Sequence, residues 1–140
     1  MFNPAGRLKY YQISRFTSVA ALLLLICFGN ILCSFAAEKT MVRWIGVDEF
    51  QSVLHKTPVI IDLRTPREFE DGHLKGAVNI PVDDLIENRT LLDAYKDRPV
   101  LLYCRTVNRT GRALRILEGS GFKSIYALRG GYEAFKLQGR

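Results

Sequence analysis

One cysteine of the sequence lies where a predicted strand gives way to a predicted helix. In the stretch Leu101–Arg115 (LLYCRTVNRTGRALR), an apolar run ends at Tyr103 and a helical pattern begins near Thr110. Cys104 is therefore expected at the carboxyl end of a strand, facing the N-terminus of a helix. Ligands of open α/β sheets bind at this position, and the free N–H groups and positive end of the helix favour an anion. The spacing predicts an anion-binding loop that carries a thiol.

Positive charge surrounds Cys104, but no base lies near it in the sequence. Arg105 and Arg109 add to the helix N-terminus in favouring the thiolate over the thiol, so a nucleophile is prepared without a proton acceptor. The histidines are His55, in a predicted helix-to-strand connection at the opposite end of the sheet, and His73, in a Gly-His turn. We expect structural roles for both histidines rather than a Cys-His dyad.

The cysteine count separates Cys104 from the other thiols. Cys27 and Cys33 fall within residues 1–36, so residues 37–140 contain Cys104 alone. A lone thiol has no disulfide partner and is either a functional group or a small buried hydrophobe, and the count does not decide between the two. One cysteine without clustered histidines gives no support for a metal site.

Residues 1–36 have the pattern of an export signal. They contain no Asp or Glu, their cations precede the apolar run Val19–Phe28, and small residues end at Ala36. Cleavage after Ala36 would leave one domain, residues 37–140. The alternative is an uncleaved membrane anchor over residues 19–37, which are just long enough to span a bilayer. We expect a periplasmic or exported protein, or a membrane-anchored one whose domain lies outside the cytoplasm.

Strand-like and helical patterns alternate along residues 37–140. Val59–Leu63 and Val100–Tyr103 are short, nearly continuous apolar runs, which are typical of strands buried on both faces of a parallel sheet. The other predicted strands are residues 42–45, 77–80 and 124–128, and the predicted helices are residues 47–55, 66–71, 91–95, 111–118 and 132–137. This alternation predicts an α/β sandwich with a mainly parallel sheet.

Helix-start signals follow the strand Val59–Leu63 at once. Thr65 is a predicted N-cap, a proline occupies the first helical position, and Glu68 is placed to reach back to the cap. Asp62 and Arg64 lie at the carboxyl end of the same strand, which is the correct edge for a site. They either serve that site or form an ion pair, with Glu68 or another acid, that holds the loops together.

The charges of the sequence are unevenly distributed around its formal net charge of +6. Residues 98–140 carry nine cations and two acids, whereas residues 37–97 carry eight cations and twelve acids. The basic half, which contains the cysteine loop, either attracts an anionic substrate or is a solvated helix face bearing Arg112 and Arg115. Nucleic-acid binding is not indicated, because basic and aromatic residues form no binding motif.

Four motifs occur in a fixed order along residues 40–140. They are Ile61-Asp62-Leu63-Arg64 with Glu68-Phe69, the string GHLKGAVNIP over residues 72–81, Tyr103-Cys104-Arg105, and Leu128-Arg129-Gly130-Gly131-Tyr132. In this order they resemble the motifs of single-domain rhodaneses, which are thiosulfate sulfurtransferases. The resemblance implies a rhodanese-like α/β sandwich with a five-stranded, mainly parallel sheet flanked by helices, and the N-terminal segment points to an exported or periplasmic type.

The resemblance also implies a chemistry that needs no metal or cofactor. Cys104 would cycle between thiolate and persulfide, and the loop Cys104–Arg109 would cradle the transferred sulfur. The implied donor is thiosulfate or a similar anion, and the implied acceptor is a thiol or cyanide. The substrate-binding residues implied are Arg105, Thr106, Val107, Asn108, Arg109, Thr110 and Arg64, with Asp62 and Glu68 as structural residues near the site.

One position departs from the similar loops, which often carry glycine where this chain has Val107. A β-branched residue resists positive φ, so a competent loop requires Val107 at negative φ. Otherwise the domain is an inactive module that binds sulfur or another protein. Phosphate ester hydrolysis is a rival chemistry on a related loop, but it requires an arginine six residues after the cysteine, where this chain has Thr110.

Overall fold

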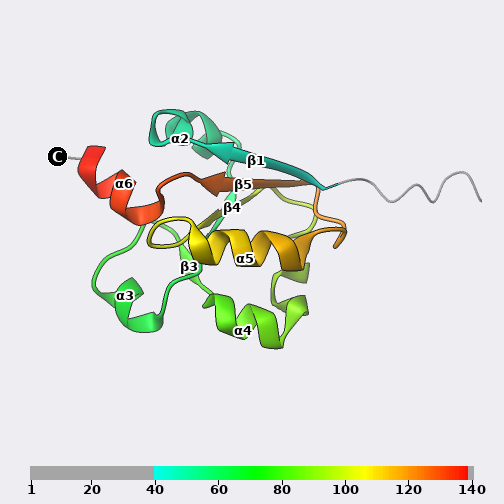
Figure 1. Cartoon of the computed structure of the whole chain (residues 1–140). Helices are drawn as coiled ribbons and strands as arrows, with labels where there is room; N and C mark the ends of the chain where they lie inside the picture. Colours follow the sequence, from blue (N-terminus) through cyan, green and yellow to red (C-terminus); the bar gives the residue numbers. More distant parts are fainter. Residues whose placement is uncertain (1–39, 139–140) are drawn as a thin grey trace, which may run out of the picture. The chain divides into compact units, whose positions relative to one another are not determined.

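A five-stranded parallel sheet forms the centre of the domain (Figure 1). The computed structural model describes residues 40–138. The strand order is β1-β5-β4-β2-β3, and all four pairings are parallel. The strands are β1 (Met41–Ile45), β2 (Val59–Asp62), β3 (Val78–Asn79), β4 (Val100–Tyr103) and β5 (Ser124–Leu128). The predicted five-stranded sheet flanked by helices is confirmed.

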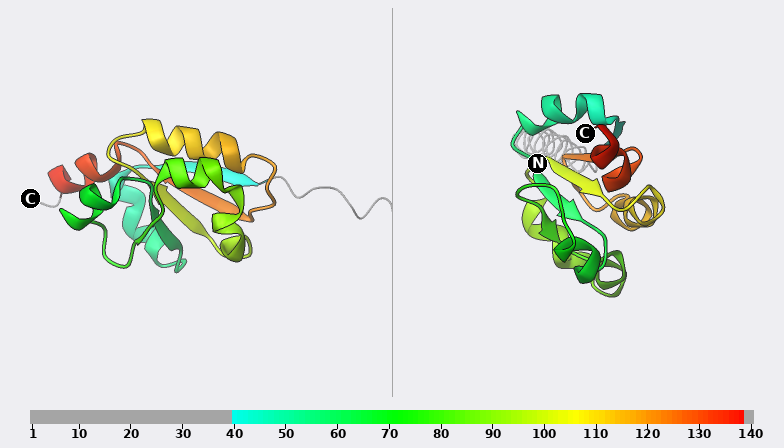
Figure 2. Two further views of the ribbon diagram at one scale, coloured as in Figure 1. Left: turned by 90° about the horizontal axis from the view of Figure 1, so that it is seen from below. Right: turned by 90° about the vertical axis from the view of Figure 1, so that its left-hand side faces the viewer.

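Helices cover both faces of this sheet (Figure 2). α2 (Val47–Leu54) and α6 (Gly131–Gln138) pack on one face, and α4 (Val82–Glu87) and α5 (Asn108–Leu117) pack on the other. The connections also contain α3 (Pro66–Glu70) and a 3-10 helix, η1 (Arg89–Tyr95). α4 was not predicted from the sequence, the helix expected over residues 91–95 is the 3-10 helix, and α5 begins three residues earlier than expected.

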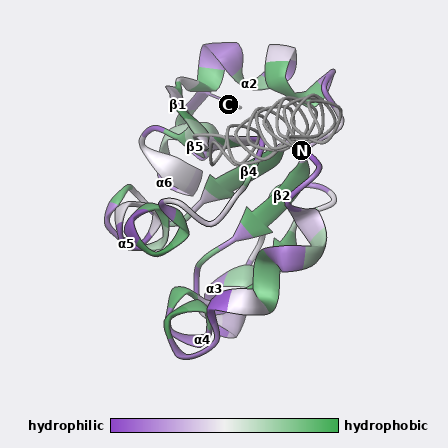
Figure 3. Cartoon of the chain, turned by 90° about the vertical axis from the view of Figure 1, so that its right-hand side faces the viewer, coloured by the Kyte–Doolittle hydropathy of each residue, from purple (hydrophilic) through white to green (hydrophobic). Residues whose placement is uncertain are grey.

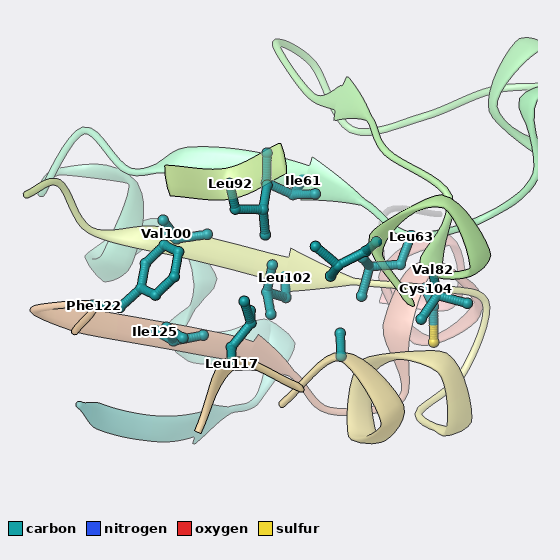
Figure 4. Packing of buried hydrophobic residues seen from close by; sticks show 12 residues of the cluster. Ile61, Leu63, Val82, Leu92, Val100, Leu102, Cys104, Leu117, Phe122 and Ile125 are labelled. Atoms are coloured by element: carbon teal, nitrogen blue, oxygen red, sulfur yellow. The ribbon is translucent and has the colours of Figure 1, made fainter. Parts of the chain in front are cut away.

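The central strand β4 contributes to the apolar clusters on both faces of the sheet. Val100 and Leu102 belong to the cluster beneath α4 and α5, whereas Leu101 and Tyr103 belong to the cluster beneath α2 and α6. Burial on both faces explains the continuous apolar run of this strand, and Figure 3 shows the hydrophobic residues concentrated on the strands. Cys104 continues the alternation, so its side chain lies on the same face as Leu102 (Figure 4).

The turn from β2 into α3 has the local structure that its sequence predicts. The Thr65 hydroxyl accepts a hydrogen bond from the Glu68 amide at 3.3 Å, and the Glu68 carboxylate accepts one from the Thr65 amide at 3.1 Å. These reciprocal bonds form a capping box, with Pro66 at the start of the helix. The capping box fixes the Glu68 carboxylate at the carboxyl edge of the sheet.

The expected export signal or membrane anchor, residues 1–36 or 19–37, lies outside the described residues. Within residues 40–138, no helix is long and apolar enough to cross a membrane. The same residues contain no cluster of His, Cys, Asp and Glu side chains with the geometry to hold a metal ion.

Candidate active site at the carboxyl end of β4

Cys104 follows β4 directly, and only 1% of its surface is exposed. Its side chain belongs to the apolar cluster that contains Leu63, Val82 and Ala113. Figure 4 shows the sulfur beside Val82, directed toward the segment that leads into α5. Residues 105–108 are exposed and form the rim above this buried sulfur. The thiol therefore has an apolar floor and a polar backbone loop over it.

The first carbonyl groups of this loop point toward the N-terminus of α6. The amide of Tyr132 donates to the Cys104 carbonyl oxygen at 2.9 Å, and the amide of Glu133 donates to the Arg105 carbonyl oxygen at 3.1 Å. Gly131 lies against the same carbonyls, with a positive φ of 59°. A Cβ atom on Gly131 would collide with the carbonyl oxygens of Cys104, Arg105 and Thr106. Only glycine combines this approach with this backbone conformation.

The amide groups of the loop consequently point the other way. In a trans peptide the N–H lies opposite to the C=O of the preceding residue, so outward carbonyls at residues 104–106 turn the amides of residues 105–107 inward. The next amides belong to the first turn of α5, where N–H groups have no partner inside the helix. Among the described residues, none of the amides of residues 105–110 has a hydrogen-bond acceptor. The loop is therefore a ring of free donors suited to an anion.

Val107 has a conformation that a β-branched residue accepts. It is the N-cap of α5, with a φ of −141° and a ψ of −22°, and its side chain provides no cap for the helix. The φ is negative, which is the conformation that a competent loop requires of a β-branched residue at this position. The residue is 38% exposed, so the valine side chain stands at the rim and not inside the amide ring.

Thr110 carries a buried hydroxyl that has no partner. The residue is fully buried in the first turn of α5, and its Oγ1 forms no hydrogen bond within the described part of the chain. A buried hydroxyl without a partner costs about 1–3 kcal/mol of stability. This residue therefore adds an unused donor to the same turn of α5 that carries the free amides.

Arg109 is held by Glu68 at the side of the loop. Its Nη1 donates to the Glu68 carboxylate at 2.7 Å. Burial raises the pKa of Glu68, but hydrogen bonds from Thr65 and Arg109 outweigh burial and hold the pKa below its ordinary value. The ionised carboxylate thus joins the capping box of α3 to the first turn of α5.

Arg64 and Asp62 form a buried ion pair that braces the neighbouring loops. The Arg64 Nη2 lies 2.6 Å from one Asp62 oxygen and donates to the Gly72 carbonyl at 2.7 Å. Burial lowers the pKa of Arg64, but the hydrogen bonds and ionic attraction to Asp62 outweigh burial and raise the pKa above its ordinary value. The Arg64 guanidinium also lies over the ring of Tyr132, 4.2 Å from its centroid. The ion pair that the sequence analysis offered as one alternative is present, and its acid is Asp62.

The structure adds residues that the sequence did not suggest for this site. Gly131 and Tyr132 hold the carbonyl side of the loop, and the Asn79 amide donates to the carbonyl oxygens of Asp62 and Arg64 at 3.0 and 2.9 Å. In the sequence, Gly131 belongs to the motif that ends at Tyr132, but its contact with the cysteine loop depends on the strand order. His55 ends α2, and His73 stacks on the Phe69 ring, so both histidines have the structural positions expected.

Comparison with known protein families identifies the family to which this domain belongs. The model of the rhodanese-like domain matches residues 46–138, which include the whole cysteine loop and its supports. The chain belongs to the rhodanese-like domain family. A crystal structure of a rhodanese-related protein from Thermoplasma volcanium superimposes with a TM-score of 0.61 at 25% identity, covering 69% of this chain and 93% of that one.

Curated relatives of this rhodanese-like domain differ in their named activities. Protein YqhL of Bacillus subtilis is 35% identical over 74% of this chain and 79% of its own length. The thiosulfate sulfurtransferase GlpE of Pseudomonas entomophila is 33% identical over 56% of this chain and 70% of its own. The chain also matches 36% of a tRNA uridine(34) hydroxylase from Buchnera aphidicola and 20% of the mouse M-phase inducer phosphatase 2, both at 28% identity.

The packing of Gly131 against the loop predicts the effect of adding a methyl group there. Gly131→Ala should lower the free energy of unfolding by about 2–4 kcal/mol, because strain at positive φ is joined by collision with three carbonyl oxygens. Gly119→Ala is the matched control, since Gly119 also has positive φ (70°) but open space around the added Cβ. Urea denaturation measures both variants. Equal losses would contradict the close approach.

Proposed function

We propose that this protein is a sulfurtransferase that moves a sulfane sulfur from thiosulfate, or a similar anionic donor, to a thiophilic acceptor through a persulfide on Cys104. The proposal rests on the free amides of residues 105–110, which lie above a buried thiol. Such a ring stabilises a small anion by charge-assisted hydrogen bonds in a site with little water. Membership of the rhodanese-like family supports the same chemistry.

The first step is attack of the Cys104 thiolate on the outer sulfur of thiosulfate. A bond forms between Sγ and this sulfur, the S–S bond of thiosulfate breaks, and sulfite leaves with the electron pair. The product is a Cys104 persulfide anion, so the total charge is the same before and after the step. The outer sulfur then lies within the loop, where the amides of residues 105–110 donate to it.

The second step returns the enzyme to its starting state. A thiolate or cyanide attacks the outer sulfur, the bond between Sγ and that sulfur breaks, and Cys104 leaves as a thiolate. The acceptor becomes a persulfide or thiocyanate, and no external oxidant or reductant is needed. The same amides, with the Thr110 hydroxyl, stabilise the leaving thiolate.

Three groups of residues have separate roles in this proposal. The exposed rim residues Arg105, Thr106 and Asn108 meet the anionic donor, and the Arg105 guanidinium there pairs with the Glu133 carboxylate at 3.4 Å. Glu68 holds Arg109 beside the loop. The Arg64–Asp62 pair positions the strand end, because Arg64 Nε and Nη2 are already bonded to Asp62 and Gly72.

Phosphate ester hydrolysis has less support as the reaction of this site, although one relative is named a phosphatase. Thr110 occupies the position where that chemistry needs an arginine, and Thr110 is fully buried. The guanidinium of Arg109, one residue earlier, is bonded to Glu68. The small ring therefore lacks an arginine free to hold the oxygens of a phosphoryl group.

Mass spectrometry of the purified protein tests the persulfide directly. After thiosulfate treatment and desalting, the intact mass should rise by one sulfur atom, and Cys104→Ser should gain no sulfur and lose turnover. An unchanged circular dichroism spectrum of the variant would show that its fold is retained. The mass also reports the N-terminus, where the proposed export signal predicts a chain that begins at Ala37. Persistent turnover in Cys104→Ser would rule out the persulfide mechanism.

The negative φ of Val107 predicts the outcome of restoring the glycine of similar loops. Val107→Gly should leave kcat/KM for thiosulfate equal or lower, because the loop is already competent, and should cost up to about 1 kcal/mol of stability through backbone entropy. Steady-state kinetics and urea denaturation measure the two effects. A gain of about tenfold or more in kcat/KM would indicate that valine distorts the native loop.

A further inference from the structure

A groove of about 490 Å³ lies between α5 and the edge strand β1, next to the cysteine loop. It is lined by Trp44, Val107, Asn108, Gly111, Arg112 and Arg115. Val107 and Asn108 also lie at the rim of the cysteine loop, whereas the other four residues have no part in the sulfur chemistry proposed above. The groove is therefore a separate surface that shares one wall with the active-site loop.

The apolar part of the groove arises because β1 is the edge of the sheet. Trp44 pairs in register with Ala127 of β5, and Val42 pairs with Ile125. Ala127 is buried, and Ile125 lies in the cluster beneath α5, but Val42 is 44% exposed. The apolar face of the sheet thus extends past the cover that α5 provides. An indole ring at this edge is suited to contact an apolar side chain of a partner.

Gly111 contributes no side chain to the α5 wall of the groove. It lies within α5, where glycine is disfavoured, and its φ is not in the left-handed region. No atom lies within 4 Å of the position that its Cβ would take, so crowding does not explain the glycine. The absence of a side chain leaves room in the groove for an occupant.

The charged residues that line the groove are two arginines, Arg112 and Arg115. Arg112 pairs with the exposed Asp83 at 2.9 Å, and Arg115 forms no ion pair with any residue from 40 to 138. Both arginines are exposed, and no carboxylate lines the groove. An occupant with apolar and acidic side chains therefore matches the surface in both respects.

We propose that this groove docks an acidic segment of a protein whose cysteine accepts the sulfane sulfur. The proposal rests on the proposed sulfurtransferase function. Val107 and Asn108 belong both to the groove and to the rim over Cys104, so a segment seated against them holds a neighbouring thiol at the mouth of the loop. The acceptor thiolate attacks the outer sulfur of the persulfide, the bond to Sγ breaks, and the partner leaves as a persulfide while Cys104 becomes a thiolate.

A single-turnover experiment separates docking from persulfide formation. Wild-type protein is loaded with thiosulfate, desalted, and mixed with one of three acceptors, and the loss of the added sulfur is followed by intact mass. The acceptors are a hexapeptide with one cysteine, one leucine and several glutamates, the same peptide with lysines in place of the glutamates, and 2-mercaptoethanol. We expect the acidic peptide to react at least about tenfold faster than the lysine peptide at low concentration.

Variants of the groove assign this preference to its residues. Arg115→Glu should reduce transfer to the acidic peptide about tenfold by weakening binding, while transfer to 2-mercaptoethanol stays the same. Gly111→Leu fills the groove with a better helix former and should give the same pattern without loss of thermal stability. Arg98→Glu is the matched control, because Arg98 is exposed before the amino end of β4 and should change neither rate by electrostatics at the groove.

The possible failures are distinct. If thiosulfate adds no sulfur to the wild-type protein, the proposed function is wrong and the docking proposal falls with it. If loading is normal but both peptides react equally, or if Arg115→Glu slows 2-mercaptoethanol as much as the acidic peptide, the docking proposal alone is overturned.

Discussion

Hydrogen bonds from the amides of Tyr132 and Glu133 to the carbonyl oxygens of Cys104 and Arg105 determine the direction of the peptide groups in the cysteine loop. Each bond turns one carbonyl toward α6 and, through the planar trans peptide, turns the following amide away from α6. The directions of the free amides at residues 105 and 106 therefore depend on a helix that contributes no side chain to them. The first turn of α5 supplies the remaining amides.

The strand order brings these two segments together. β4 and β5 are adjacent and parallel, so both carboxyl ends reach the same edge of the sheet, one leading to the cysteine loop and the other to α6. Gly131 then permits backbone-to-backbone contact that any side chain would prevent. On the opposite side, the capping box of α3 and the Glu68–Arg109 ion pair brace the start of α5. The loop that follows Cys104 is thus held in place by α6 on one side and, through α5, by α3 on the other.

Much of this arrangement was predictable because local patterns determine it. The buried apolar runs indicated β2 and β4. The bounds of β5 are those expected, and the Thr65 cap placed the start of α3. α4 was missed because a helix of six residues shows too little periodicity. The contact of Gly131 with the loop, and the choice of Asp62 as the partner of Arg64, depend on tertiary neighbours. The sequence showed that a competent loop requires a negative φ at Val107, but it did not show whether the loop has one. A residue type sets a backbone preference, and the loop's tertiary contacts decide the conformation.

The role of the loop amides is tested by observing them while the sulfur is bound. Amide proton and nitrogen shifts are compared by nuclear magnetic resonance before and after thiosulfate treatment of the wild-type protein, with Cys104→Ser as the control. We predict that the amide protons of residues 105–110 move downfield on persulfide formation, more than those elsewhere, and stay in place in Cys104→Ser. A persulfide detected by mass with these amides unmoved would contradict the proposed role of the loop.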